Sequence, residues 1–431
     1  MTMTEPTPTG CACGDDSQTD SAGLTRRQLL SRAAAVGAGT AVAGGLATRM
    51  SFAATPYDGD VLVVLSLRGG FDGLNSIVPV AEPRYLQLRP NVGIHERALL
   101  PLDARFGLHP SLRPLQPFWK DGTFGVVHAV GMADPTRSHF AAMAEMERAA
   151  PGTSVRSGWI DRLLGLRGSG TTYQAMQVGD LTAAAAFSGP KPELAMLSVS
   201  DFTLSGVHDG EDYRRWKRAL GQLNANAPAV VSDPAHIALS ALGTARELQR
   251  AGYRPRSTAT YPNTPLGHAL RDLARLIKAR VGLQVAAVDY GDWDMHAGMG
   301  SVDSGWLHDH LGDLARSLAA FATDLGPALD RVTLLTLSEF GRRVKENGSG
   351  GTDHGHGQAV LMLGGGVRGG QVHGTWPGLA DYELVDGDLA GTTDYRVLLA
   401  EALEKRCGAS GLATVFPGLP ADRVGAFKPR A

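Results

Sequence analysis

The sequence predicts an α/β protein in which a mainly parallel β-sheet is covered by helices on both faces, giving three layers (an α/β/α sandwich). Short apolar runs alternate along the chain with longer segments of helical periodicity, which is the pattern of parallel sheets. The runs lack a regular alternation of polar and apolar residues, as expected of strands buried on both faces. The 55 glycines predict many tight turns between these elements.

Six apolar runs predict the strands. The clearest is residues 60–67, DVLVVLSL, which is rich in leucine and β-branched residues and ends at the glycine-rich turn RGGFDG. The other runs cover residues 124–130, 194–199, 283–289, 332–337 and 359–363. Helical patterns cover residues 140–149, 210–224, 236–251, 266–280, 307–325 and 394–406. In such a sheet, ligands bind beyond the carboxyl ends of the strands.

Residues 1–54 are predicted to be a twin-arginine signal peptide. Arg26 and Arg27 precede apolar residues, an uncharged Ala- and Gly-rich run follows at 33–48, and small residues near 51–54 suit a signal peptidase. The run is shorter than the roughly 20 apolar residues of a membrane span. We therefore expect the twin-arginine translocase to carry the folded protein out of the cytoplasm, to be secreted or kept in the cell envelope. The general secretory route is the alternative.

Composition excludes several classes of protein. With 41 Lys and Arg against 43 Asp and Glu, the chain has no basic footprint for nucleic acid. No second apolar stretch reaches membrane-span length. Cys11 and Cys13 lie in the signal, so the mature chain keeps only Cys407 and forms no internal disulfide. Residues 55–431 are predicted to form a single domain, with a possible insertion or cap at 150–265, where Pro- and Thr-rich loops interrupt the pattern.

Polar residues gather after the predicted strands. Asp292 and His296 follow the run 283–289, and a carboxylate and an imidazole four residues apart can converge on zinc, manganese or iron. Asp353, His354 and His356 form a second group before the run 359–363. Both groups also suit solvated polar turns. His373 and His128 are further candidates, although a buried, hydrogen-bonded histidine is the commoner case.

Two further segments carry hydroxyl and carboxylate groups. Ser338 and Glu339 follow the run 332–337, so a strand delivers both to the same edge of the sheet. Thr136 and Ser138 precede the helix at 140–149, where either could cap the helix. Alternatively, one of these hydroxyls, beside His139, could attack an anionic ester at the helix N-terminus. Both interpretations stay open.

Several of these segments together resemble the bacterial "domain of unknown function 1501" family. They are LRGGFDGLN at 67–75, RSHF at 137–140, LSEFGR at 337–342 and GTDHG at 351–355, in addition to the twin-arginine signal. The resemblance covers nearly the whole mature chain. That family is grouped with the alkaline phosphatase-like superfamily, which includes phosphatases, sulfatases and phosphoglycerate mutases. The resemblance implies an alkaline phosphatase-like fold.

The resemblance also implies metal ligands. One metal of the superfamily takes an Asp-x-x-x-His pair and a later histidine, which match Asp292, His296 and His354, with His356 and His373 as rivals. The second metal takes an aspartate after the first strand, the nucleophile and an Asp-His pair after a later strand. Here Arg68 replaces that aspartate, with Asp72 four residues on.

Ser338-Glu339 likewise stands where the superfamily has its Asp-His pair. An alternative alignment takes Asp353-His354 as that pair and His373 as the later ligand. We prefer the first alignment because residues 336–339 end a predicted strand, as that motif should. The second site has then lost most of its ligands. Arg68 would stabilise the anion and Glu339 would serve as a base or remaining ligand.

These observations predict a secreted, divalent-metal-dependent hydrolase of phosphate or sulfate esters, with Ser138 or Thr136 attacking a small anionic ester or glycan. The alternative is an extracytoplasmic binding or assembly protein that keeps the fold and has lost catalysis. An oxidoreductase is disfavoured, because no dinucleotide fingerprint opens a helix and no iron–sulfur or haem cysteine spacing exists in the mature chain.

Overall fold

The centre of the fold is a nine-stranded sheet in the order β11-β5-β10-β9-β1-β8-β6-β7, with β12 also paired to β5. Its strands are β1 Val61–Leu67, β5 Phe124–Gly131, β6 Ala175–Val178, β7 Leu194–Met196, β8 Val285–Tyr290, β9 Val332–Leu337, β10 Gln358–Leu363, β11 Val372–His373 and β12 Thr393–Asp394. Strand β10 runs antiparallel to β5 and β9, and the other pairings are parallel. The mainly parallel sheet is thus confirmed.

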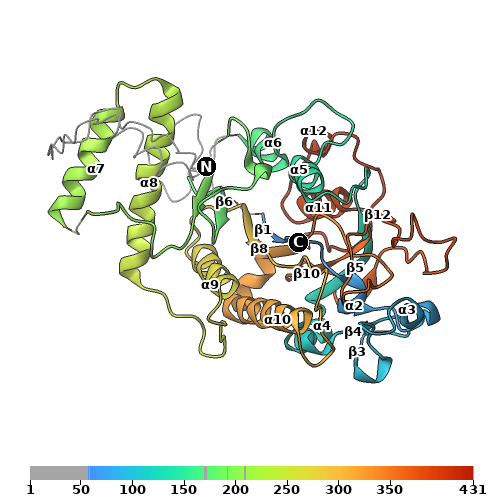
Figure 1. Cartoon of the computed structure of the whole chain (residues 1–431). Coiled ribbons are helices and arrows are strands. Elements are labelled where there is room, and N and C mark those ends of the chain that lie inside the picture. Colours follow the sequence, from blue (N-terminus) through green and yellow to red (C-terminus); the bar gives the residue numbers. More distant parts are fainter. Residues whose placement is uncertain (1–56, 58, 169–171, 192, 208–209, 431) are drawn as a thin grey trace, which may run out of the picture. The chain divides into compact units, whose positions relative to one another are not determined.

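The structure, a computed structural model, describes residue 57 and residues 59–168, 172–191, 193–207 and 210–430 (Figure 1). The predicted signal peptide, residues 1–54, lies outside the described residues, together with Cys11 and Cys13. A small antiparallel sheet joins β2 Ile77–Val78, β4 Gly107–Leu108 and β3 Leu100–Pro101. No helix in the described ranges is long and apolar enough to cross a membrane.

Helices cover both faces of the sheet, and others, such as α7, lie apart from it. The α-helices of the described residues are α2 Gly73–Ser76, α3 Pro83–Leu88, α4 Gln116–Lys120, α5 His139–Arg148, α6 Trp159–Arg167, α7 Glu211–Asn224, α8 Ala229–Ala251, α9 Pro265–Lys278, α10 Trp306–Leu325, α11 Tyr395–Lys405 and α12 Leu412–Val415. Short 3-10 helices occur at η1 Glu96–Ala98, η2 Pro110–Leu115, η3 Ala185–Phe187 and η4 Gly326–Arg331.

Alternate side chains of β1 divide between two hydrophobic cores. Val63 and Leu65 pack in the core that contains α9 and α10, and Leu62 and Val64 pack in the core of α5, α6 and α11. All seven residues of β1 are buried, and each large apolar side chain contributes about 1.5–3 kcal/mol. The α/β/α layers follow from this two-sided burial, and Figure 1 shows α9 and α10 on one side of the sheet and α5, α6 and α11 on the other.

All six predicted strands and all six predicted helices are present. Helix α8 begins at Ala229, seven residues before its predicted start, because it accommodates Pro234 in its interior. Prediction missed the short β6 and α6. Residues 150–265 contain α6, β6, β7, α7 and α8; β6 and β7 extend the main sheet, and α7 packs against α8. That this region is an insertion or cap stays a prediction.

One edge of the sheet collects the polar loops. The carboxyl ends of β1, β5, β8 and β9 lie there, and because β10 is reversed, its amino end lies there too. The loop between β9 and β10 therefore meets the segments that follow β1, β5 and β8.

Candidate metal centre

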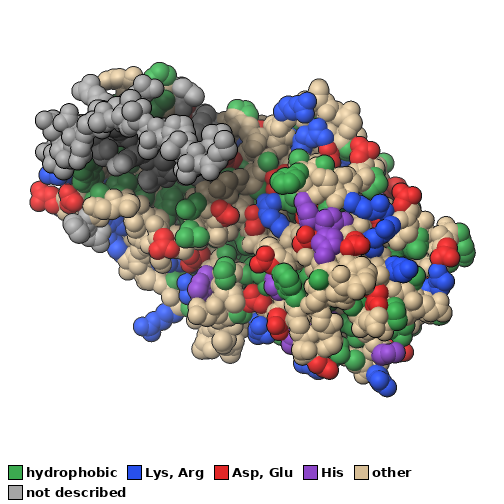
Figure 2. Space-filling model, in the orientation of Figure 1, with side chains coloured by type: hydrophobic (Ala, Val, Ile, Leu, Met, Phe, Trp, Pro, Cys, Tyr) green, Lys and Arg blue, Asp and Glu red, His purple; other side chains and the backbone are tan. Residues whose placement is uncertain are grey.

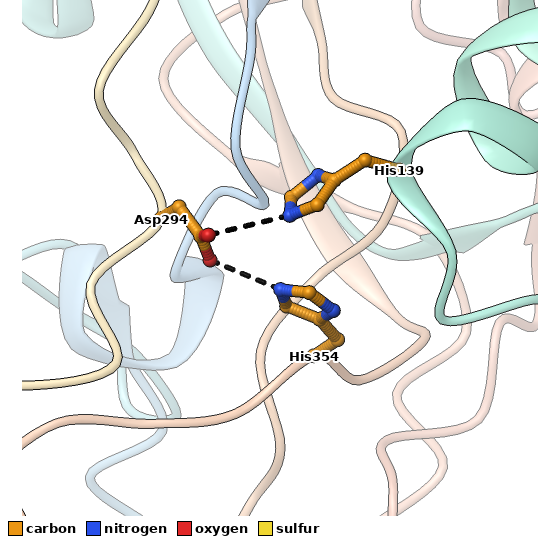
Figure 3. Close-up of side chains that lie close together, drawn as sticks. All are labelled: His139, Asp294 and His354. Carbon is orange, nitrogen blue, oxygen red and sulfur yellow. Dashed lines mark hydrogen bonds and ion pairs between the residues drawn. The ribbon is translucent and has the colours of Figure 1, made fainter. Parts of the chain in front are cut away.

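Three histidines converge on Asp294 at this edge. His139 is the first residue of α5, Asp294 and His296 follow β8, and His354 lies between β9 and β10. Asp294 Oδ1 is 3.0 Å from His354 Nε2 and 3.1 Å from His296 Nε2, and Asp294 Oδ2 is 3.4 Å from His139 Nε2 (Figure 3). The ligand atoms of His139, Asp294 and His354 all lie within 4.8 Å of one another.

The second nitrogen of each imidazole is hydrogen-bonded behind this group. Each Nδ1 lies 2.8 Å from an oxygen: Glu339 Oε1 for His139, Asp353 Oδ1 for His296, and the Arg137 carbonyl for His354. An ionised carboxylate or a carbonyl only accepts, so each Nδ1 carries a proton, and the neutral form of each imidazole would present its Nε2 lone pair beside Asp294. Outer partners of this kind orient histidines that bind metals.

The donor set fits a divalent cation. The Nε2 atoms of His139 and His354 lie with the Asp294 carboxylate in one group, and His296 Nε2 lies beside Asp294 and His354. Imidazole nitrogen with carboxylate oxygen suits zinc, manganese or iron. Figure 2 shows a patch of histidine side chains on the face drawn, with acidic and basic side chains beside it.

Burial of alternate residues sets the direction of the loop after β8. Trp293 and Met295 are buried, whereas Asp292, Asp294 and His296 reach the surface. The Trp293 ring packs edge-on against Phe71 at 5.1 Å. A Cβ at Gly69, which has φ +121°, would lie 2.5 Å from the Asp294 amide nitrogen. The close approach of the two loops that places Asp294 therefore requires glycine at this position.

Arg342 balances the negative charge of Asp294. Its buried guanidinium donates to Asp294 Oδ1 at 2.8 Å and to the carbonyls of Gly69 and Thr352. Burial opposes ionisation of Asp294, but the hydrogen bond and the positive charge of Arg342 help to outweigh it, and the pKa of Asp294 is lowered to about 2. Hydrogen bonds from Asn347 and His296 likewise lower the pKa of Asp353. Both carboxylates are thus ionised near neutral pH.

The predicted metal ligands fall into two groups. His296 and His354 lie in the centre, and Asp353 stands behind His296. Among the described residues, Asp292, the expected partner of His296, makes no hydrogen bond or ion pair with the centre. It has φ +64°, and its charge acts on His310. Asp294, two residues on, takes the place expected for it.

Three other predicted ligands lie elsewhere. His356 Nε2 is 3.3 Å from the Met132 carbonyl, and His373 Nε2 on β11 is 2.7 Å from the Arg368 carbonyl. Asp72 is buried in an ion pair with Arg89 at 2.8 Å. These side chains are engaged elsewhere in the fold and are not brought to the centre, although His356 Nδ1 is buried without a hydrogen-bond partner in the described residues.

Two of the predicted catalytic groups are engaged by the protein itself. Glu339 Oε1 accepts from the Gly69 amide at 2.9 Å as well as from His139, and Glu339 Oε2 accepts from Ser338 Oγ at 3.1 Å. Glu339 is 2% exposed, so it supports His139. The guanidinium of Arg68 lies 3.0 Å from Glu147 and 2.8 Å from Asp289.

The predicted hydroxyls lie directly before His139. Ser138 is the N-cap residue of α5, but its side chain makes no capping bond and is exposed. Thr136 Oγ1 accepts from the Ser138 amide at 3.3 Å. Sequence reasoning named His139 only as a neighbour of these hydroxyls and missed Asp294 and Arg342. The adjacency of His139 to Ser138, and the Asp-x-His spacing of Asp294 and His296, were the available signals.

The fold and this centre define an α/β protein with a histidine–carboxylate site at the carboxyl edge of its sheet. Residues 130–400 match the model of the family described as "Protein of unknown function (DUF1501)", and the chain belongs to that family. The resemblance seen in the sequence is thereby confirmed. No curated protein matches the chain.

Solved structures of sulfatases and related enzymes align with the chain at low similarity. PsFucS1 sulfatase from Pseudoalteromonas sp. is 12% identical, with a TM-score of 0.36, over 88% of this chain and 72% of that one. The phosphonate monoester hydrolase of Agrobacterium radiobacter is 10% identical, with a TM-score of 0.33, over 84% and 78%. At these scores the likeness supports no argument about activity.

Proposed function

We propose that this protein is a divalent-metal-dependent hydrolase of phosphate or sulfate esters. The observation that carries the proposal is the close grouping of the His139, Asp294 and His354 ligand atoms, with His296 Nε2 3.1 Å from Asp294. A metal bound there would polarise an ester oxygen and stabilise the charge that develops on it. His139, His296, His354 and Asp294 hold the metal in this proposal.

The surrounding residues have separate roles in the proposal. Glu339 and Asp353 fix the tautomers of His139 and His296, and Arg342 keeps Asp294 ionised. The Ser138 hydroxyl is the proposed nucleophile, because it is exposed and directly precedes a metal ligand at the N-terminus of α5. Thr136 is the alternative. Arg68 is not assigned to the anion, since two carboxylates already neutralise its guanidinium.

We further propose that the protein acts outside the cytoplasm. The paired arginines and the uncharged run of residues 33–48 support recognition by the twin-arginine translocase and removal of residues 1–54. The substrate would then be a small anionic ester or glycan of the cell envelope or its surroundings.

One observation favours a second candidate function. Arg68 and Glu339, which occupy positions of the missing second metal site, are bound by neighbouring side chains and backbone. Such internal bonding is expected of a protein that keeps the fold and one metal but has lost turnover. In this second candidate the protein binds an anionic ligand without hydrolysing it.

Metal content and turnover together test both candidates. The mature protein would be purified without chelator or histidine tag, its metals measured by mass spectrometry, and aryl phosphates and sulfates offered as substrates. We expect about one metal per chain and turnover, both lost in His296→Ala and both kept in the control His373→Ala. One metal without turnover would favour the binding protein. A folded wild-type protein without metal would show that the site does not bind a metal.

A further inference from the structure

Two arginines beside the candidate metal centre are held by one buried carboxylate. Arg137 donates from Nε and Nη2 to Asp388 Oδ2 at 2.9 and 2.5 Å, and Arg343 donates from Nε to Asp388 Oδ1 at 3.1 Å. Both also donate from Nη2 to the Asp386 carbonyl. Asp388 is 2% exposed, whereas the side chains of Arg137 and Arg343 are 45% and 37% exposed.

A tight hairpin presents the acceptors for this cluster. Val385 and Asp388 exchange two backbone hydrogen bonds, at 3.0 and 2.9 Å, around the two-residue turn Asp386-Gly387. Both turn residues have positive φ, 52° and 79°, as a type I′ turn requires, and Asp-Gly is a preferred sequence for it. The turn thus fixes Asp388 and the Asp386 carbonyl toward the two guanidiniums.

The cluster is joined directly to the metal centre. The carbonyl of Arg137 accepts from His354 Nδ1 at 2.8 Å, and the amide of Arg343 donates to the Asp353 carbonyl at 2.9 Å. Figure 2 shows basic side chains next to the histidine patch. The backbones of both arginines therefore adjoin the residues of the centre.

The cluster of Arg137, Arg343 and Asp388 has a net positive charge and N–H donors that are not used in hydrogen bonds within the described residues. Two guanidiniums and one carboxylate leave one net positive charge, and in the described residues neither Arg137 Nη1 nor Arg343 Nη1 has a hydrogen-bond partner. Each guanidinium is already oriented by two acceptors, so an incoming anion would immobilise little further side-chain freedom. Planar guanidiniums present paired donors that match phosphate, sulfate and carboxylate groups.

We propose that Arg137 and Arg343, held by Asp388, bind a second anionic group of the substrate. This inference rests on the proposed function and narrows it: the substrate class is a polyanionic ester, such as a multiply sulfated or phosphorylated glycan. One ester group lies at the metal centre and another anionic group lies on the arginine pair.

The first test uses inorganic sulfate and does not depend on turnover. Sulfate binding to the metal-free protein would be measured by calorimetry at constant ionic strength, for the wild type, Arg343→Gln and Arg137→Gln. Arg423→Gln is the control, since Arg423 is a similarly exposed arginine paired with Glu404 at 3.2 Å. We expect sulfate affinity to fall about tenfold in the first two variants, one charge-assisted hydrogen bond each, and to stay unchanged in the control. Equal binding by all four proteins would overturn the proposal.

The second test separates this inference from the proposed function. If the wild type hydrolyses esters, Arg343→Gln should raise KM about tenfold for a substrate with two anionic groups, with kcat and metal content unchanged. KM for a singly charged aryl ester should not change. A wild type without turnover but with arginine-dependent sulfate binding would reject the hydrolase and keep the anion site. Unfolding temperatures would check that the variants fold. Arg343→Lys would keep the positive charge but lose the paired N–H donors of the guanidinium.

Discussion

The Nε2 atoms of His296 and His354 lie 2.9 Å apart, and both lie within 3.1 Å of Asp294 Oδ1. Their Nδ1 protons are committed to Asp353 and to the Arg137 carbonyl. Two nitrogens bound to one tetrahedral zinc at about 2.05 Å would be about 3.3 Å apart, so the pair needs to open only slightly. This separation is therefore close to the one that two ligands of the proposed metal would have.

The two neighbouring aspartates of the β8 loop should differ sharply in metal binding. Asp294→Asn removes a proposed ligand and should weaken metal affinity by at least about 100-fold. Substituting a residue that only hydrogen-bonds to a ligand already lowers metal affinity about 10–100-fold. Asp292→Asn should leave affinity unchanged, because in the described residues Asp292 makes no hydrogen bond or ion pair with the centre and its charge acts on His310. Competition with a coloured chelator would measure both. Loss of metal in Asp292→Asn alone would instead restore the pairing predicted from sequence.

Glu339 should act on the metal through His139. Glu339→Gln keeps an acceptor near the imidazole but removes its negative charge, which makes Nε2 a weaker donor to a metal. We expect metal affinity to fall about 10–100-fold. The control is Glu346→Gln, because the Glu346 carboxylate accepts hydrogen bonds from the amides of Asn91 and Val92, away from the centre. Unfolding measured with and without chelator would separate lost affinity from lost stability; equal affinity in wild type and Glu339→Gln would contradict this role.

The fold could be predicted because its signal is local. Runs such as residues 60–67 are apolar on both faces, and this composition alone indicates a strand buried between two helical layers. The short β6 and α6 were missed because a strand of four residues and a helix of nine carry too little periodicity.

Only some residues of the candidate metal centre could be predicted, because the direction of a side chain depends on packing between residues that are far apart in the sequence. Spacing alone paired His296 with Asp292, but burial of Trp293 against Phe71 turns Asp294 toward the histidines. Similarly, nothing local reveals that Arg68 is neutralised, because its partner Asp289 is brought close only by the register of β1 and β8.

Phe140 should contribute to ligand binding and not to stability. It follows His139 in the first turn of α5, and 91% of it is exposed, so it buries almost no apolar surface in the fold. Phe140→Ala should change the free energy of unfolding by less than about 0.5 kcal/mol. It should weaken binding of a substrate whose sugar or aryl ring covers the exposed ring. The control is Leu223→Ala on α7, because Leu223 is also an exposed apolar residue, with 54% of its surface accessible. Similar substrate affinity for Phe140→Ala and the wild type would exclude a contact between Phe140 and the substrate.

Glu193 should make stability depend on pH. Burial, and then the charge of Asp161, raise the pKa of Glu193 from 4.5 to about 7 in the folded protein. Below about pH 4.5 the Glu193 carboxyl is protonated in both the folded and the unfolded state, so it does not lower the free energy of unfolding. As pH rises toward 7 the unfolded state loses the proton first, and the folded state is destabilised relative to it.

Glu193→Gln removes this titration. The variant should therefore gain stability over the wild type between pH 5 and pH 7 and keep a constant advantage above that, at most about 3 kcal/mol. Urea unfolding of both proteins at pH 5 and pH 8 measures the difference, with the exposed Glu404→Gln as the control. A stability difference that is the same at both pH values would mean that the Glu193 carboxyl titrates alike in the folded and unfolded chain.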